Sequence, residues 1–272
     1  MNVLILSDLH LGSPASRCES MLGDIRHLAR RFKRVILNGD TLDRYEAPNA
    51  HARAADLIRN AREACCPGDG GVEILTGNHD PAISDRHWVY LPESQSLVFH
   101  GDCVADCTHP YKREDQALSA SMQAAWDKVG GRPERFLDLV DVYRQVQAEH
   151  LKHHLTACEP RTFFDYLRLV LIPPHKPLYI LRYWYRAPRL AAQLGRNFDQ
   201  PVRNVVVGHS HRAGQWRFGD ITVHNTGAFM PLAAPHAAVE VNGKLHLHRL
   251  TDLLRTHQTV SMPVSSISQP AQ

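Results

Sequence analysis

The chain has 272 residues, of which 43% are hydrophobic, so it can form one large α/β domain with an insertion, or two small domains. The net charge of +3 is too small to indicate a nucleic-acid partner, and we expect none. The six cysteines show neither a disulfide framework nor a paired CxxC zinc pattern. The sequence shows no signal peptide and no run of ~20 apolar residues, so we expect a cytoplasmic protein with reduced thiols.

Five apolar runs are predicted to be buried strands, and each is followed directly by polar residues. These runs are residues 2–7, 34–37, 73–75, 97–99 and 205–207. Helical spacing of apolar residues predicts helices over 20–33 and 50–64, and short strands are expected at 221–223, 238–241 and 245–247. Ligands bind beyond the carboxyl ends of the strands in open α/β sheets, so we expect one sheet edge to gather the polar residues.

The segment 109–199 breaks this order. It contains two amphipathic helical patterns, at 113–127 and 133–155, followed by a hydrophobic and basic stretch. We therefore expect residues 1–108 and 200–256 to form the core and residues 109–199 to form a helical insertion or cap. Residues 257–272 are rich in Ser, Pro and Gln and are predicted to be a flexible tail.

The polar residues after the five runs are candidate metal ligands. The motifs are Asp8-Leu9-His10, Gly39-Asp40, Gly77-Asn78-His79-Asp80, His100-Gly101-Asp102 and Gly208-His209-Ser210-His211. Seven nitrogen and oxygen ligands are too many for one four-coordinate ion and suit two ions that share a carboxylate. Imidazole, carboxylate and amide ligands without thiolate suit two divalent ions, Mn²⁺ first, with Fe or Zn²⁺ as alternatives. Such a pair points to hydrolysis at phosphorus.

The order and spacing of these motifs resemble the calcineurin-like metallophosphoesterase superfamily, whose pattern is D-x-H, G-D, G-N-H-D/E, H and G-H-x-H. The resemblance implies a four-layer α/β sandwich of two mixed β-sheets flanked by helices. It also implies ligand roles. Asp8, His10 and His211 would bind the first metal, Asn78, His100 and His209 the second, and Asp40 would bridge the two.

The same resemblance assigns His79 to the leaving-group side, as a general acid or a phosphate stabiliser. Asp80 is a candidate to orient His79, as carboxylates orient catalytic imidazoles. The nucleophile expected is a hydroxide held by both metal ions. His224 and Asn225 are further candidates for the substrate site, because they belong to a turn sequence that often lies near the metals in this superfamily.

Residues 161–196 combine basic, apolar and aromatic side chains. Seven Arg or Lys residues stand against one acidic residue, Asp165. Such a segment can bind an anionic lipid surface, can cover an anionic and partly apolar substrate, or can be ordinary core with arginines that face water.

Within the superfamily, the layout is similar to that of the UDP-2,3-diacylglucosamine pyrophosphatases. The similarity lies in His100-Gly101-Asp102, in the nearby Asp106 as a substrate-binding candidate, and in the helical insertion before the last histidine motif. The chain departs from that branch at His79, where many members carry Arg. This resemblance implies a lipid-linked nucleotide substrate and a peripheral position at the inner face of the membrane. The alternatives are a phosphodiesterase or phosphomonoesterase acting on a phosphorylated small molecule, or a catalytically silent scaffold.

Overall fold

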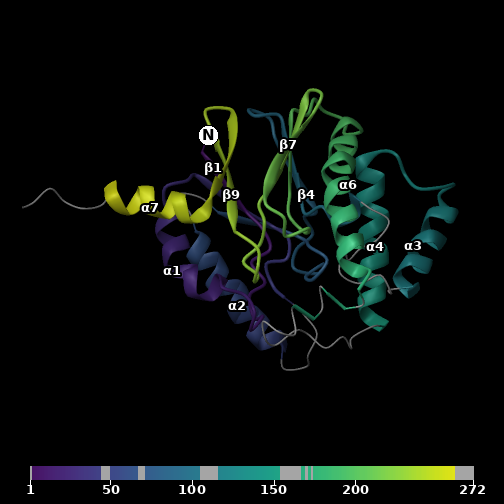
Figure 1. Ribbon diagram of the computed structural model, residues 1–272, viewed down its shortest axis with the longest axis horizontal. Helices are drawn as coiled ribbons and strands as arrows, with labels where there is room; N and C mark the ends of the chain where they lie inside the picture. The colour runs from purple at the N-terminus through teal and green to yellow at the C-terminus, as the bar shows by residue number, and fades with distance from the viewer. Residues whose placement is uncertain are drawn as a thin grey trace, which may run out of the picture.

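The computed structural model describes residues 2–43, 50–66, 71–104, 116–153, 167–168, 171–172 and 174–260. Two five-stranded sheets pack face to face, and helices cover the outer face of each sheet (Figure 1). The layers are therefore helices, sheet, sheet and helices, which confirms the predicted four-layer α/β sandwich.

The first sheet has the strand order β10-β9-β1-β2-β3. Its strands are β1 (Val3–Leu6), β2 (Arg34–Asn38), β3 (Val72–Leu75), β9 (His236–Val241) and β10 (Lys244–Arg249). The first three are parallel, whereas β9 and β10 are antiparallel to their neighbours. On its outer side lie α1 (Cys18–Ala29), α2 (Ala50–Cys65) and α7 (Leu250–Val260) (Figure 1).

The second sheet has the strand order β4-β5-β6-β8-β7. Its strands are β4 (Trp88–Leu91), β5 (Ser96–Phe99), β6 (Asn204–Val207), β7 (Gly214–Phe218) and β8 (Ile221–Asn225). The three central strands are parallel, and the edge strands β4 and β7 are antiparallel. Its outer layer consists of α3 (Gln116–Lys128), α4 (Phe136–His153) and α6 (Lys176–Arg196), and a short 3₁₀ turn, η1 (Asp102–Val104), follows β5 (Figure 1).

Strand β1 shows why the inner strands appear in the sequence as continuous apolar runs. Val3 and Ile5 pack between the two sheets, whereas Leu4 and Leu6 pack against the first helical layer. A strand that is buried on both faces needs apolar side chains at every position, so the period-two alternation disappears.

The helices of the segment 109–199 share one hydrophobic core with the second sheet. Phe136 and Tyr143 of α4 and Ala191 of α6 are buried together with Phe99 and Val205 of the strands. In the described residues, the segment thus supplies the outer helical layer of the sandwich and shares its core.

The five motifs follow strands of both sheets. Three come after β1, β2 and β3 of the first sheet, and two come after β5 and β6 of the second. The expectation of a single sheet edge was therefore wrong, because apolar runs identify buried strands but not the strands they pair with. The motifs meet where the carboxyl ends of the two facing sheets come together.

The C-terminal segment begins with α7, which continues to Val260 and so includes residues 257–260 of the predicted tail. Residues 261–272 lie outside the described part of the chain. Among the described helices, none is both long enough and apolar enough to span a membrane.

Candidate metal centre

The candidate ligands sit in loops with unusual backbone geometry. Asp8, His10, Asp40, His209 and His211 all have positive φ angles, between 47° and 63°. Non-glycine residues rarely adopt this left-handed region, and each costs on the order of 1 kcal/mol or more. Such strain concentrates at functional sites, where the surrounding fold imposes it.

The first group of side chains is Asp8, His10 and His211, which the family resemblance assigns to the first metal. Nε2 of His10 lies 3.2 Å from Nε2 of His211 and 4.0 Å from Oδ1 of Asp8, and the distance from His211 Nε2 to Asp8 Oδ1 is 3.4 Å. The circle through these three atoms has a radius of about 2.1 Å, which equals the usual distance from a metal to imidazole nitrogen or carboxylate oxygen. The three side chains therefore fit around one ion.

The second group is formed by Asn78, His100 and His209. Oδ1 of Asn78 lies 3.1 Å from Nε2 of His100 and 2.7 Å from Nδ1 of His209. Nδ1 of His100 lies 3.0 Å from the backbone oxygen of Asn38, so that nitrogen carries the proton and Nε2 faces the group. Hydrogen bonds of this kind orient metal-binding histidines.

Asp40 lies between the two groups. Its Oδ2 atom is 3.2 Å from His100 Nε2 and 3.9 Å from His10 Nε2. Its other oxygen, Oδ1, accepts a hydrogen bond of 2.9 Å from the backbone N–H of His79. One oxygen of Asp40 thus faces both groups.

Two glycines allow this close packing. A Cβ atom on Gly39 would lie 2.5 Å from the ring of His100, and Gly39 has a positive φ of 78°. A Cβ atom on Gly208 would overlap the carboxylate of Asp8. Only glycine lets the backbone approach the ligands at these points.

The electrostatics of the centre favour cations. Burial would raise the pKa of Asp40, but the neighbouring His100 and His79 hold it well below its usual range. Burial opposes a charge on His100, yet the attraction of Asp40 and Asp8 raises the pKa of His100 to about 10. Burial and the nearby His100 lower the pKa of His209 to about 3, so its imidazole is neutral and one of its two nitrogens carries no proton and can bind a metal.

Asp43 is a site residue that the sequence analysis missed. Its Oδ1 atom lies 2.9 Å from Nδ1 of His10 and 3.4 Å from Nδ1 of His79. Nδ1 of His79 also lies 2.6 Å from the backbone oxygen of Asp43. The signal was present, because Asp43 follows Asp40 by three residues in the same loop.

Asp80 and His79 occupy different places from those expected of an orienting pair. The carboxylate of Asp80 accepts backbone N–H groups from Asp40, Thr41, Leu42 and Gly77, at distances of 2.7–3.1 Å. It thereby ties the loop after β2 to the turn after β3. The contacts that orient the imidazole of His79 come from Asp43.

The structure describes two of the three candidate substrate residues, and these two lie in different places. Asn225 donates hydrogen bonds to the backbone oxygen of Gly208 and to Ser210, and so supports the last histidine motif. His224 points elsewhere, with Nε2 3.2 Å from Oδ1 of Asn204 at the start of β6, the strand end opposite that motif. Asp106 lies outside the described residues.

Helix α6 contacts the last motif directly. Nε1 of Trp184 donates a hydrogen bond of 2.9 Å to the backbone oxygen of Ser210. The ring of Tyr183 packs edge-on to His209, with the ring centres 6.1 Å apart. The outer helical layer therefore forms part of the wall of the centre.

Comparison with known sequences identifies one matching family. The family model described as calcineurin-like phosphoesterase matches residues 1–213, which contain all five motifs. No curated protein matches the chain.

Several solved structures resemble the chain at low sequence identity. A predicted phosphoesterase of Streptococcus pneumoniae TIGR4 is 13% identical, over 88% of this chain and 80% of that one, with a TM-score of 0.34. Vps29 of Entamoeba histolytica, in complex with zinc, is 12% identical, over 92% and 98%, with a TM-score of 0.37. A cold-active protein-tyrosine phosphatase of a Shewanella species is 13% identical, over 90% and 77%, with a TM-score of 0.38. Likeness at this level assigns neither a substrate nor a partner.

Proposed function

Because the chain belongs to the calcineurin-like phosphoesterase family and is a metal-dependent phosphoesterase, we propose that it hydrolyses a phosphate ester or pyrophosphate at a two-metal centre. The observation that carries the proposal is the position of Asp40 Oδ2, which faces His100 of one ligand group and His10 of the other. A shared carboxylate oxygen is what distinguishes a dinuclear centre from two separate sites.

The ligand roles in this proposal follow the two groups. Asp8, His10 and His211 hold the first ion, and Asn78, His100 and His209 hold the second. We propose Mn²⁺ as the native metal, because the set contains imidazole, carboxylate and amide but no thiolate. A pair of divalent ions supplies Lewis acidity to the phosphoryl group and activates a water molecule.

His79 is the proposed proton donor to the leaving group. Its Nδ1 atom is tied to the backbone oxygen of Asp43, so Nε2 is the nitrogen that can give up a proton. The side chain is 23% exposed, whereas those of Asp40 and His100 are buried, so His79 lies where the centre meets solvent. A proton donor at this border can meet the leaving group of a bound substrate.

Metal loading followed by an activity panel tests this function. The purified chain would be loaded with Mn²⁺ and assayed with a phosphomonoester, a phosphodiester, a nucleotide diphosphate sugar and its diacylated form. We expect phosphate-bond hydrolysis that needs the metal and is lost in Asp40→Asn. Binding of well under one equivalent of Mn²⁺, with no hydrolysis of any substrate, would favour the scaffold alternative.

For the substrate class, we propose a lipid-linked nucleotide diphosphate at an anionic membrane surface. The outward face of α6 supports this, because Leu178, Leu181 and Tyr185 are 71%, 55% and 82% exposed. Arg182 and Arg186 lie exposed on the same face, one helical turn apart. The helix carries four Arg and one Lys and no acidic residue. Exposed apolar side chains among cations suit the headgroup region of anionic lipid.

The two faces of α6 link this surface to the centre. Its inner face packs on the last histidine motif through Trp184, while its outer face presents the apolar and basic side chains. A lipid-linked substrate held at the outer face would therefore lie one helix width from the candidate metal ions. The alternative, a phosphorylated small molecule, needs no such surface.

Vesicle co-sedimentation separates these alternatives. We expect binding to vesicles that contain phosphatidylglycerol, but not to phosphatidylcholine alone. Each Arg at an anionic surface contributes about 1 kcal/mol, so Arg182→Gln with Arg186→Gln should weaken binding about 30-fold. Val129→Ser is the matched control, because Val129 is an exposed apolar residue outside α6. Absence of binding to anionic vesicles at low salt, with intact activity on a soluble diester, would favour the small-molecule alternative.

A further inference from the structure

A buried arginine from the helical layer reaches the metal centre. Arg144 lies in α4, is 7% exposed, and forms a two-pronged ion pair with Asp102, with nitrogen–oxygen distances of 2.8 and 3.0 Å. Its guanidinium also donates to the backbone oxygens of Thr76 and Gly77, at 3.2 and 3.1 Å. Planar guanidinium groups are suited to such multiple, fixed contacts.

The partners of Arg144 are the neighbours of two proposed metal ligands. Thr76 and Gly77 immediately precede Asn78, and Asp102 follows His100 by two residues. The first loop leaves β3 of the first sheet, whereas the second leaves β5 of the second sheet. One side chain thus joins the two sheets at the point where the second ligand group is assembled.

The turn that carries Asn78 is held from two sides. Asp80 accepts the backbone N–H of Gly77 at 2.9 Å, and Arg144 donates to the backbone oxygen of the same residue. Because both the N–H and the C=O of Gly77 are held, the turn has little freedom to move the Asn78 side chain away from His100. Oδ1 of Asn78 lies 3.1 Å from Nε2 of His100. Positions of reacting groups must be fixed to fractions of an ångström for efficient catalysis.

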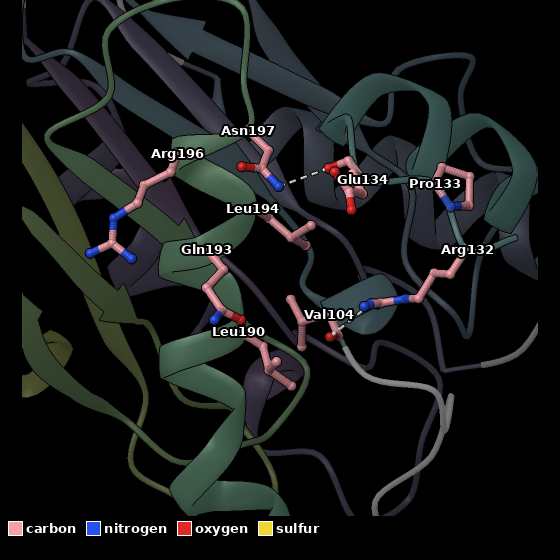
Figure 2. A pocket seen from close by; sticks show the side chains of 9 residues that line it. All are labelled: Val104, Arg132, Pro133, Glu134, Leu190, Gln193, Leu194, Arg196 and Asn197. Atoms are coloured by element: carbon pink, nitrogen blue, oxygen red, sulfur yellow. Dashed lines mark hydrogen bonds between the residues drawn. The ribbon is translucent and has the colours of Figure 1, made fainter.

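Helix α4 is itself firmly placed. Within α4, Gln147 accepts a hydrogen bond from Arg144 at 2.8 Å and donates one to the hydroxyl of Tyr143 at 3.1 Å, which holds the arginine side chain against its own helix. The loop before the helix is tied on both sides, because Arg132 donates to the backbone oxygen of Val104 in η1, and Asn197, just after α6, donates to that of Glu134 (Figure 2). The guanidinium of Arg144 therefore projects from a rigid support.

We infer that Arg144 is a positioning residue for the site of the second metal. It holds the loops of Asn78 and His100 against each other and so keeps the second ligand group together. The inference rests on the metal centre proposed above. It assigns to the segment 109–199 a part in building the centre, in addition to any part in substrate binding. The first ligand group, with Asp8, His10 and His211, makes none of the contacts described for Arg144.

The test is a Mn²⁺ titration of the metal-free full chain by calorimetry, compared with the same titration of Arg144→Met. We expect two equivalents to bind to the parent protein. In Arg144→Met, the first equivalent should bind as before, and the affinity for the second should fall about 10- to 100-fold, as for other residues that support metal ligands. The affinity of Arg144→Lys for the second Mn²⁺ should lie between those of the parent protein and Arg144→Met, because an ammonium group keeps one charge contact with Asp102 but not the two-pronged ion pair. Hydrolysis by both variants should recover at high Mn²⁺.

Two controls separate positioning from general loss of stability. Val140→Ala removes a buried side chain of the same helix and should lower the melting temperature, yet leave both Mn²⁺ affinities unchanged. Arg135→Met breaks an exposed ion pair with Asp199 and should change neither the melting temperature nor the Mn²⁺ affinities. If Arg144→Met does not fold, Asp102→Asn weakens the same link and should show the same selective loss.

The outcomes distinguish the two proposals. A parent protein that binds fewer than two equivalents overturns the two-metal function on which the inference rests. A parent protein that binds two, together with variants that bind two with unchanged affinity, overturns only the role of Arg144. Equal weakening of both equivalents would also overturn it, because the role assigned here is specific to the second metal.

Discussion

The carboxylate of Asp43 lies 2.9 Å from Nδ1 of His10, so it fixes this imidazole through the nitrogen that faces away from the candidate metal. Nε2 of His10 is thereby turned toward Asp8 and His211. The same carboxylate lies 3.4 Å from Nδ1 of His79. One side chain thus orients a proposed ligand and the proposed proton donor together. Burial would raise the pKa of Asp43, but His10 and His79 hold it far below its usual range.

A single substitution of Asp43 should therefore affect both metal binding and turnover. We expect Asp43→Asn to lower both the affinity for the first Mn²⁺ and kcat about 10- to 100-fold, because the amide can still accept a hydrogen bond but no longer carries charge. Calorimetric titration and steady-state kinetics would measure the two effects. Asp56→Asn, which breaks an exposed ion pair with Arg59 on α2, is the matched control and should change neither quantity.

Replacing the shared carboxylate should have a larger effect. In Asp40→Asn, the charge that faces both ligand groups is lost, so we expect at most one Mn²⁺ to bind and activity to fall more than about 100-fold. Metal analysis after gel filtration gives the stoichiometry, and circular dichroism checks the fold. A variant that retained two ions and near-normal activity would show that Asp40 does not bridge.

The role of His79 in turnover should be distinguishable from the role of the metal ligands. We expect His79→Gln to lower kcat by about 10²- to 10⁴-fold, the usual contribution of a general acid, while two Mn²⁺ ions still bind. A substrate whose leaving group needs no proton, such as a nitrophenyl ester, should be affected less than an alkyl ester. If the substitution emptied a metal position, His79 would be a ligand and the proposed division of roles would be wrong.

Much of the fold could be predicted because its inner strands are buried on both faces. The runs around Val3–Leu6, Arg34–Asn38 and Asn204–Val207 stand out as apolar, and the structure has strands there. The edge strands β4 and β7 were missed. All five residues of β7 are at least partly exposed and its sequence shows no apolar run, whereas β4 is apolar but only four residues long, with two of them partly exposed. Helix α6 was not predicted, because Pro173-Pro174 and Pro177 were interpreted as interruptions of the segment, whereas Pro177 lies in the first turn of the helix, where proline is tolerated.

Part of the site could also be predicted from the sequence, and part could not. The proposed ligands could be found because each follows a strand in a short motif, and the structure brings all seven together. For Asp43, the spacing of three residues after Asp40 marks a place near the site but not its role, and Arg144 could not be assigned from spacing at all. Asp43 acts through His10 in the neighbouring loop, and Arg144 comes from a helix some forty residues away in sequence from Asp102. Their roles depend on packing between the sheets and the helical layer, which local patterns do not record.

A pH-dependent stability is expected from His224, which is buried between Asn204 and the region of His246. Burial, with a smaller effect of His246, lowers the pKa of His224 to about 4. In the unfolded chain the pKa is about 6.5, so above that pH both states are neutral and the residue adds no pH dependence. As the pH falls from about 6.5 toward 4, only the unfolded state gains the proton, and the free energy of unfolding should fall by about 2 kcal/mol at pH 5.

Urea unfolding at pH 8 and pH 5, with EDTA present to remove metal effects, would measure this loss. In His224→Gln the part due to His224 should disappear, so the difference in unfolding free energy between the two pH values should shrink by about 2 kcal/mol relative to the parent. His248→Gln is the control, because His248 is an exposed histidine on β10, and it should behave as the parent does. An unchanged pH dependence in His224→Gln would mean that His224 takes up its proton in the folded protein as readily as in the unfolded chain.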